Sequence, residues 1–188
     1  MMEPYVIHFA PLQGYTDSVY REAHAQIFGG VETYYTPFVR LEKTGFRNKE
    51  LRDLVPEANP LFYNGDIRTL PDIRSLTGRF PRLKGIMIGR GLLSSPWLAT
   101  EYISDTPLTA QEKIEKLSAF HTLLLAGYSF RLEGGEHQVL DKMKTLWDYL
   151  LPDAEKRLRK KILKSSRLAD YQEAVRNLIY DTSITAGQ

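Results

Sequence analysis

Short apolar runs alternate with polar, glycine-containing turns in the first part of the chain. The runs at 61–63 and 85–88 are followed by turns at 64–66 (Asn-Gly-Asp) and 89–91 (Gly-Arg-Gly). Apolar runs this short, bounded by turn residues, are typical of buried strands. Between them, apolar residues recur at every third position over 67–76, which is the pattern of an amphipathic helix, with Pro71 and Asp72 in its first turn. This stretch therefore predicts a strand, a helix and a second strand.

Two further strands are predicted nearer the start of the chain. Residues 5–10 are apolar enough for a buried strand, and residues 33–39 are rich in β-forming side chains. A helix capped by Thr16 or Asp17 is predicted between them, and a short helix is predicted at 48–54. The alternation of strands and helices favours a parallel β/α architecture.

The chain is too short for a complete barrel of this kind. A closed eight-stranded β/α barrel usually takes about 250 residues, and the strand pattern here ends near residue 106. We therefore expect the α/β fold class, with a partial (β/α) TIM-type barrel over residues 1–106 and an all-α helical bundle over residues 107–188. The first bundle helix is predicted to begin at Pro107 or Thr109 and to end near residue 132, and the others are predicted at 136–151, 154–164 and 167–180.

Composition excludes several classes of protein. The chain has 188 residues and no cysteine, which removes disulfides, thiolate metal sites and cysteine chemistry. Its four histidines show no ligand spacing, so no metal site is predicted. No apolar run reaches the roughly 20 residues of a membrane span, and the first residues have no basic segment typical of a signal peptide. We expect a cytoplasmic protein.

The net charge of +2 is small, but the basic residues are concentrated in the bundle. Clustered Lys and Arg side chains neutralise several phosphates at once, so a nucleic-acid partner is indicated. The alternative is a solvated polar helix face. The candidate RNA-binding residues are Lys142, Lys144, Arg157, Arg159, Lys160, Lys161, Lys164 and Arg167.

The two glycine turns point to a second kind of site. In a parallel sheet both turns fall at the carboxyl ends of their strands, on one rim, where glycine lets the backbone present N–H groups to an anion. Barrels of this type often bind phosphate there, together with a short extra helix, for which residues 95–98 are a plausible start. Arg90 can add a charged contact. Each turn taken alone is more typical of an ordinary tight turn, whereas the two turns together on one rim favour the phosphate site.

Three parts of the chain resemble the tRNA-dihydrouridine synthases. Residues 10–17 (Ala-Pro-Leu-Gln-Gly-Tyr-Thr-Asp), followed by Tyr20-Arg21, resemble the opening APMAGVTD…FR motif of that family. Residues 64–67 and 89–91 resemble its late phosphate-binding motifs, and the bundle is similar to its tRNA-contacting helical domain. Together these matches cover nearly the whole chain, in the family's order.

The resemblance implies an FMN-dependent enzyme in which hydride from NADPH reduces the C5–C6 bond of a uridine in tRNA. It places three residues against the flavin ring, namely Pro11, Leu12 and Gln13, with Leu12 where the family usually has methionine. The residues that it assigns to the flavin phosphate and its turns are Asn64, Gly65, Asp66, Gly89, Arg90 and Gly91.

The chain also departs from the family. The family's middle section carries an NxGCP segment whose cysteine protonates the uracil, a KxR strand whose lysine supports the flavin, and a strand that bears a histidine. Here residues 59–60 run straight into the strand at 61–63, and no residue is predicted to be catalytic. Tyr35, Arg40 and Lys43 are expected near the rim, but nothing identifies any of them as a replacement acid.

Three functions are compatible with these observations. The first is a dihydrouridine synthase family protein with impaired or absent activity, and the second is a non-catalytic tRNA-binding remnant that uses the basic bundle. The third is an unrelated phosphate-sugar enzyme, which the two glycine turns alone would allow and which the opening motif and the bundle disfavour. A half barrel has open edges, so a homodimer that closes one barrel is also a hypothesis.

Overall fold

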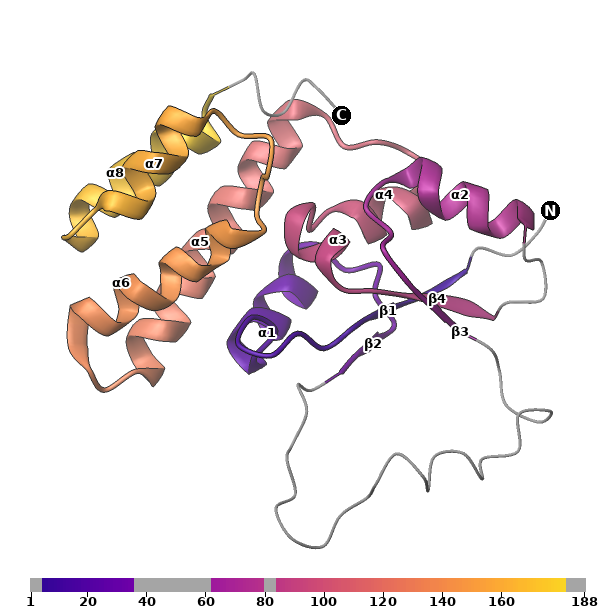
Figure 1. Ribbon diagram of the computed structural model, residues 1–188, viewed down its shortest axis with the longest axis horizontal. Helices are drawn as coiled ribbons and strands as arrows, with labels where there is room; N and C mark the ends of the chain where they lie inside the picture. The colour runs from indigo at the N-terminus through magenta and orange to yellow at the C-terminus, as the bar shows by residue number, and fades with distance from the viewer. Residues whose placement is uncertain (1–4, 36–61, 80–83, 182–188) are drawn as a thin grey trace, which may run out of the picture.

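The computed structural model describes residues 5–35, 62–79 and 84–181. A parallel sheet with short helices around it lies beside a group of longer helices (Figure 1). The strands are β1 (Val6–Phe9), β2 (Thr33–Tyr34), β3 (Phe62–Asn64) and β4 (Gly85–Ile88). The helices are α1 (Ser18–Ile27), α2 (Leu70–Arg79), α3 (Arg90–Ser94), α4 (Leu98–Ser104), α5 (Ala110–Arg131), α6 (Gly135–Thr145), the 3₁₀ helix η2 (Leu146–Asp148), α7 (Lys156–Lys164) and α8 (Leu168–Ile179).

The sheet has the strand order β2-β1-β4-β3, and every pairing is parallel. The first strand therefore pairs with the last one, with Phe9 opposite Ile88. In a closed barrel whose strands follow chain order, the first and last strands meet in this way. The described residues form an open four-stranded sheet, which confirms the α/β class and is consistent with a partial barrel.

Several predicted boundaries were wrong. α2 begins at Leu70, with Pro71 and Asp72 in its first turn as predicted, but the apolar pattern begins three residues earlier. Asp72 Oδ2 accepts hydrogen bonds from the backbone N–H groups of Arg68 and Thr69, both at 2.9 Å. These contacts fix residues 68 and 69 outside the helix. Ile67 is buried, but it lies in the loop before α2.

The helix predicted at 136–151 is shorter than expected. α6 ends at Thr145 and passes into η2, after which Leu151 adopts a left-handed backbone with φ of 49°. α7 begins at Lys156, two residues later than predicted. The predicted cap of α1 is resolved in favour of Asp17, whose side chain accepts a hydrogen bond from Tyr20 N. The helix predicted at 48–54 lies outside the described residues.

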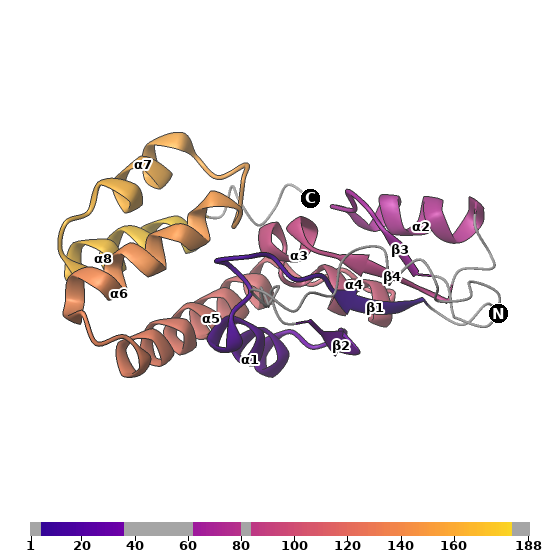
Figure 2. The ribbon, with the colours of Figure 1, turned by 60° about the horizontal axis from the view of Figure 1, so that its bottom comes forward.

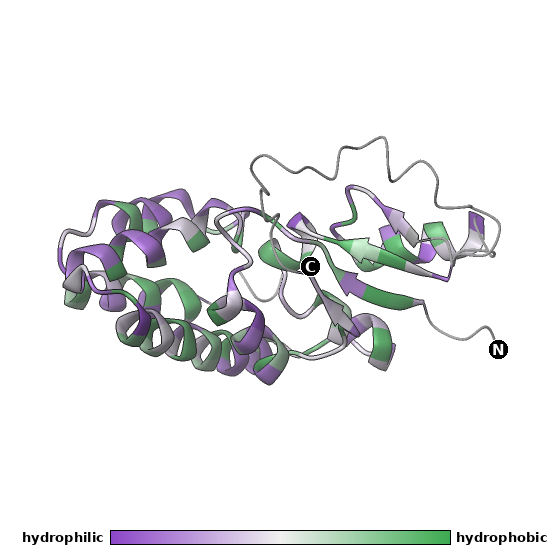
Figure 3. Cartoon of the chain, turned by 90° about the horizontal axis from the view of Figure 1, so that it is seen from below, coloured by the Kyte–Doolittle hydropathy of each residue, from purple (hydrophilic) through white to green (hydrophobic). Residues whose placement is uncertain are grey.

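One hydrophobic core joins the sheet and the bundle. α5 packs against α1 and also contacts α6 and α8 (Figures 1 and 2). Phe120 on α5 makes edge contacts with the rings of Tyr20 and Phe28, at centroid distances of 5.3 Å. Hydrophobic residues predominate on the strands, whereas the helices carry both hydrophobic and hydrophilic residues (Figure 3). The predicted division into two domains at residue 106 stays a prediction, because α5 packs both on α1, beside the sheet, and on the bundle helices α6 and α8.

A buried ion pair ties α4 to α5. Lys113 Nζ lies 3.1 Å from Glu101 Oε1, and both side chains are almost fully buried. Glu101 also accepts a hydrogen bond from Leu108 N at 2.9 Å, and Lys113 lies over the ring of Trp97. Both buried charges therefore have interaction partners at the junction between the sheet and the bundle, so neither is left unpaired in the core.

Candidate functional site

The loops that follow β1, β3 and β4 meet at one rim of the sheet, as the sequence predicted. Arg90 Nη2 lies 3.3 Å from Asp66 Oδ1, which joins the two glycine turns. A Cβ atom on Gly89 would lie 2.7 Å from Leu12 Cδ1, so the loop after β1 packs directly on the turn after β4. Residues 12, 66, 89 and 90 are thereby brought together.

Gly91 is required by a close approach of two backbones. A Cβ atom at this position would collide with the carbonyl oxygen of Ile67 and lie 2.9 Å from Ile88 Cγ2. The first turn of α3 therefore packs against the loop after β3 with no room for a side chain. Residues 89–91 are the cap and first turn of α3 and not the free turn that the sequence suggested.

Two arginine side chains share one carboxylate oxygen on this rim. Asp66 Oδ1 is shared between Arg90, at 3.3 Å, and Arg68, at 3.1 Å. All three side chains are about half exposed. Because two guanidinium groups face one carboxylate, the rim has donor capacity left for an anion.

The loop after β1 is a tight turn held by Thr16. Its hydroxyl oxygen accepts a hydrogen bond from Leu12 N at 2.9 Å and donates one to the Leu12 carbonyl at 3.3 Å. Pro11 and Leu12 are half-buried, whereas Gln13 is exposed. The three residues assigned to the flavin ring thus lie on an ordered turn at the rim.

The bundle touches the same rim. Tyr15 donates a hydrogen bond to Asp148 Oδ2 at 3.0 Å, and its ring meets that of Tyr149 edge-on. Leu151 N donates to the carbonyl of Ser94, at the end of α3, at 3.2 Å. The link between α6 and α7 therefore lies beside the loop after β1 and the end of α3. The helix expected near residues 95–98 is α4, which begins at Leu98.

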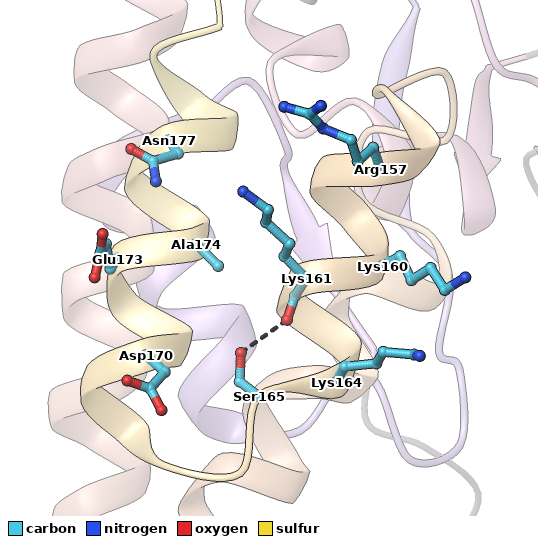
Figure 4. Close-up of a pocket in the computed structure, with 9 residues that line it drawn as sticks. All are labelled: Arg157, Lys160, Lys161, Lys164, Ser165, Asp170, Glu173, Ala174 and Asn177. Atoms are coloured by element: carbon cyan, nitrogen blue, oxygen red, sulfur yellow. Dashed lines mark hydrogen bonds between the residues drawn. The ribbon is translucent and has the colours of Figure 1, made fainter.

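Most of the predicted RNA-binding residues lie on α7 (Figure 4). A groove of about 460 Å³ runs between α7 and α8. Lys161 points into this groove, whereas Lys160 and Lys164 point away from α8. The groove is lined by Arg157, Lys160, Lys161, Lys164, Ser165, Asp170, Glu173, Ala174 and Asn177.

The remaining basic residues have different surroundings. Arg167 makes two hydrogen bonds to the Asp170 carboxylate, both at 2.8 Å. Arg159 is half-buried and donates to the Leu151 carbonyl at 3.5 Å. Lys142 and Lys144 lie on α6, away from the groove, and Lys142 is paired with Asp17 at 3.2 Å. The structure therefore groups the residues of α7 and separates Lys142 from them.

Comparison with known families decides the relationship. The family model for dihydrouridine synthase (Dus) matches residues 47–180. The chain belongs to the dihydrouridine synthase family. This match includes both glycine turns and almost all of the bundle, and it confirms the family that the sequence resembles; the opening motif at residues 10–17 lies outside the matched range. A search of curated proteins found no match.

The rim residues fit the cofactor of this family. Dihydrouridine synthases are flavin-dependent and act on tRNA. A flavin phosphate is an anion, and the rim offers the half-exposed guanidinium of Arg90 beside the first turn of α3. Gly89 is buried, and it has no side chain because Leu12 already occupies the space beside it.

Sequence analysis missed a contact on the other face of the sheet. His8 Nδ1 lies 3.0 Å from the Tyr35 hydroxyl. Phe9 packs on His24 of α1, so strand alternation turns His8 to the opposite face. The alternation of side chains along β1 could have predicted that His8 and Phe9 lie on opposite faces of the sheet. Tyr35 is described, whereas Arg40 and Lys43 lie outside the described residues.

Two further features are absent from the described residues. No group of three or more His, Asp or Glu side chains is placed there to hold a metal ion. None of the described helices has the length and apolar character that a membrane span needs.

Proposed function

We propose that the rim binds FMN and that the basic bundle binds tRNA. The observation that carries the proposal is the meeting of three loops at one place, through the contacts of Leu12 with Gly89 and of Asp66 with Arg90. In this proposal Pro11, Leu12 and Gln13 lie along the flavin ring. The phosphate is held by the residues of the two turns, namely Asn64, Gly65, Asp66, Gly89, Arg90 and Gly91.

FMN, when bound, supplies hydride-transfer chemistry with NADPH as the reductant. The residues of this chain orient it and hold its phosphate. Arg90 would exchange its contact with Asp66 for the phosphate oxygens, which accept charge-assisted hydrogen bonds from a guanidinium. Leu12 would present an apolar surface to the ring.

The position of the bundle supports a role in binding tRNA. The link between α6 and α7 contacts the rim loop after β1 through Asp148 and Tyr15. An RNA held by α7 would therefore lie next to the rim loops. Lys160, Lys161 and Lys164 supply the charge that phosphates need.

We further infer that this chain reduces uridine poorly. Hydride addition to C5–C6 leaves a developing carbanion, which a positioned acid must protonate. In the family this acid is the cysteine of the NxGCP segment, and the chain has no cysteine. A missing general acid lowers the rate by about 10² to 10⁴.

The activity is tested with FMN-saturated protein, NADPH and unmodified tRNA. Nucleoside mass spectrometry measures dihydrouridine, and a cysteine-containing member of the family is assayed beside it. We expect the rate to be at least about 100-fold lower than that of the control. NADPH oxidation without tRNA checks separately that the flavin is reduced. A rate within tenfold of the control contradicts the proposal.

A second function is favoured by the basic cluster on α7. If the rim does not hold FMN, the bundle alone would make the chain a non-catalytic tRNA-binding protein. Its distinguishing property is RNA affinity that does not depend on added FMN.

A further inference from the structure

Lys142 reaches from α6 to the loop that follows β1. Its Nζ donates a hydrogen bond to the Gly14 carbonyl at 2.7 Å and lies 3.2 Å from Asp17 Oδ2. It also lies over the Tyr128 ring, 5.2 Å from the centroid. The side chain is only 21% exposed. The ammonium group is therefore engaged within the protein, unlike a lysine whose charge is directed to solvent.

The carboxylate that pairs with Lys142 is itself fixed. Asp17 Oδ1 accepts hydrogen bonds from Tyr20 N at 3.1 Å and from the Tyr128 hydroxyl at 3.0 Å. These donors belong to α1 and α5, which pack against each other. Lys142 therefore meets an acceptor whose position is set by two helices.

The carbonyl that Lys142 contacts belongs to a residue with an unusual backbone. Gly14 has φ of +86°, and a Cβ atom there would meet nothing within 4 Å. Glycine is thus needed for its conformation and not for space. The hydrogen bond from Lys142 to the Gly14 carbonyl therefore stabilises the turn in which Gly14 has its left-handed conformation.

The loop after β1 also contacts the turn that follows β4. Tyr15 N and Thr16 N both donate to the Leu12 carbonyl at 3.1 Å. The Leu12 side chain packs on Gly89. A contiguous set of contacts therefore runs from α6 through the loop to the turn after β4.

We propose that Lys142 is a positioning residue, which sets the conformation of the loop at residues 11–16 from the bundle. The inference rests on the proposed function in one respect, which is that this loop lies along the flavin ring. It also replaces the RNA-binding role that the sequence suggested for Lys142. The bundle then has two tasks, contact with RNA through α7 and ordering of the loop through α6.

The test compares Lys142→Met, which keeps the apolar stem and removes the ammonium, with the matched substitution Lys144→Met on the same helix. Amide hydrogen exchange is measured on FMN-free protein at Tyr15 and Thr16 and, as a reference, in α5. We expect Lys142→Met to lower protection at the two loop amides at least tenfold relative to α5. Lys144→Met should leave this ratio unchanged.

Two results would overturn the proposal. One is unchanged protection of the loop amides in folded Lys142→Met, and the other is an equal loss in the loop and in α5, which would make Lys142 a general structural residue. Should Lys142→Met not fold, Lys142→Gln is measured in its place, because Gln also removes the charge but keeps a polar side chain.

A second readout separates this inference from the proposed function. FMN affinity is measured for the same variants by flavin fluorescence. Loss of loop protection together with at least threefold weaker FMN binding supports both statements. Loss of protection with unchanged FMN affinity supports the role of Lys142 and contradicts the place of the loop at the ring.

Discussion

His24 is a neutral histidine enclosed by aromatic rings. It is fully buried, and its Nδ1 lies 2.8 Å from the Tyr34 hydroxyl. The Phe9 ring lies 5.0 Å from the imidazole, measured between centroids. Burial lowers the pKa of His24 to about 3, although the Pro96 carbonyl acts in the opposite direction. The folded protein thus excludes the imidazolium form.

The stability of the fold should therefore fall in mild acid. A histidine with a pKa of about 3 in the folded state and 6.5 in the unfolded state stabilises the fold fully above pH 6.5. Its contribution is lost progressively as the pH falls below 6.5, because only the unfolded chain takes up the proton. From pH 7.5 to 5.5 the loss is about 1.4 kcal/mol for such a group.

His121 behaves in the same way, since burial lowers its pKa to about 4. Urea denaturation at the two pH values measures the combined loss. We expect His121→Gln to remove about half of the pH dependence. A free energy of unfolding that is the same at pH 7.5 and 5.5 would contradict this account.

At the residue scale the sequence predicted the kinds of residue at the rim but not their contacts. The glycine turns were recognisable because they follow apolar strands. The collision that makes Gly91 necessary involves the carbonyl of Ile67, which local patterns do not reveal. The sequence did not distinguish Lys142 from the other basic residues, because its partner Gly14 is 128 positions away along the chain.

At the scale of elements, helices with strong local signals were predicted best. α5 begins after Thr109, where a capping box with Glu112 satisfies the first turn. The ends of α2 and α6 were misplaced, because side-chain hydrogen bonds at Asp72 and the 3₁₀ turn at residues 146–148 override the apolar period.

The basic face of α7 gives the clearest prediction for an element. Lys160, Lys161 and Lys164 line the groove or its outer side, while Ile162 is buried and holds the helix in place. Replacing the three lysines by alanine should weaken tRNA binding. It should also lower the slope of log K against log salt by about 2 to 3, since each lost phosphate contact contributes about 0.7 to 0.9.

A matched control removes three charges elsewhere, through Arg74→Ala, Arg79→Ala and Lys84→Ala at exposed positions around α2. Filter binding over a range of salt concentrations compares the two triple variants. The control should keep the wild-type slope to within about one unit. Equal slopes for wild type and the α7 variant would show that this helix face is only solvated.

At the scale of the molecule, chain length predicted an incomplete barrel, and the pairing of β1 with β4 explains how it is incomplete. The described strands are those that flank the seam where a barrel of this order closes. The sequence could not supply this pairing, because it joins the first strand to one far along the chain. β2 and β3 form the two ends of the described sheet, and closure by a second copy stays a prediction.

We predict that the loops after β1, β3 and β4 form one flavin site. The most direct measurement is the visible absorption spectrum of the protein after incubation with FMN and removal of the excess. We predict a retained flavin band that corresponds to about one FMN per chain, and a much weaker band in Arg90→Met. Colourless wild-type protein would contradict the claim and would leave RNA binding by the bundle as the remaining function.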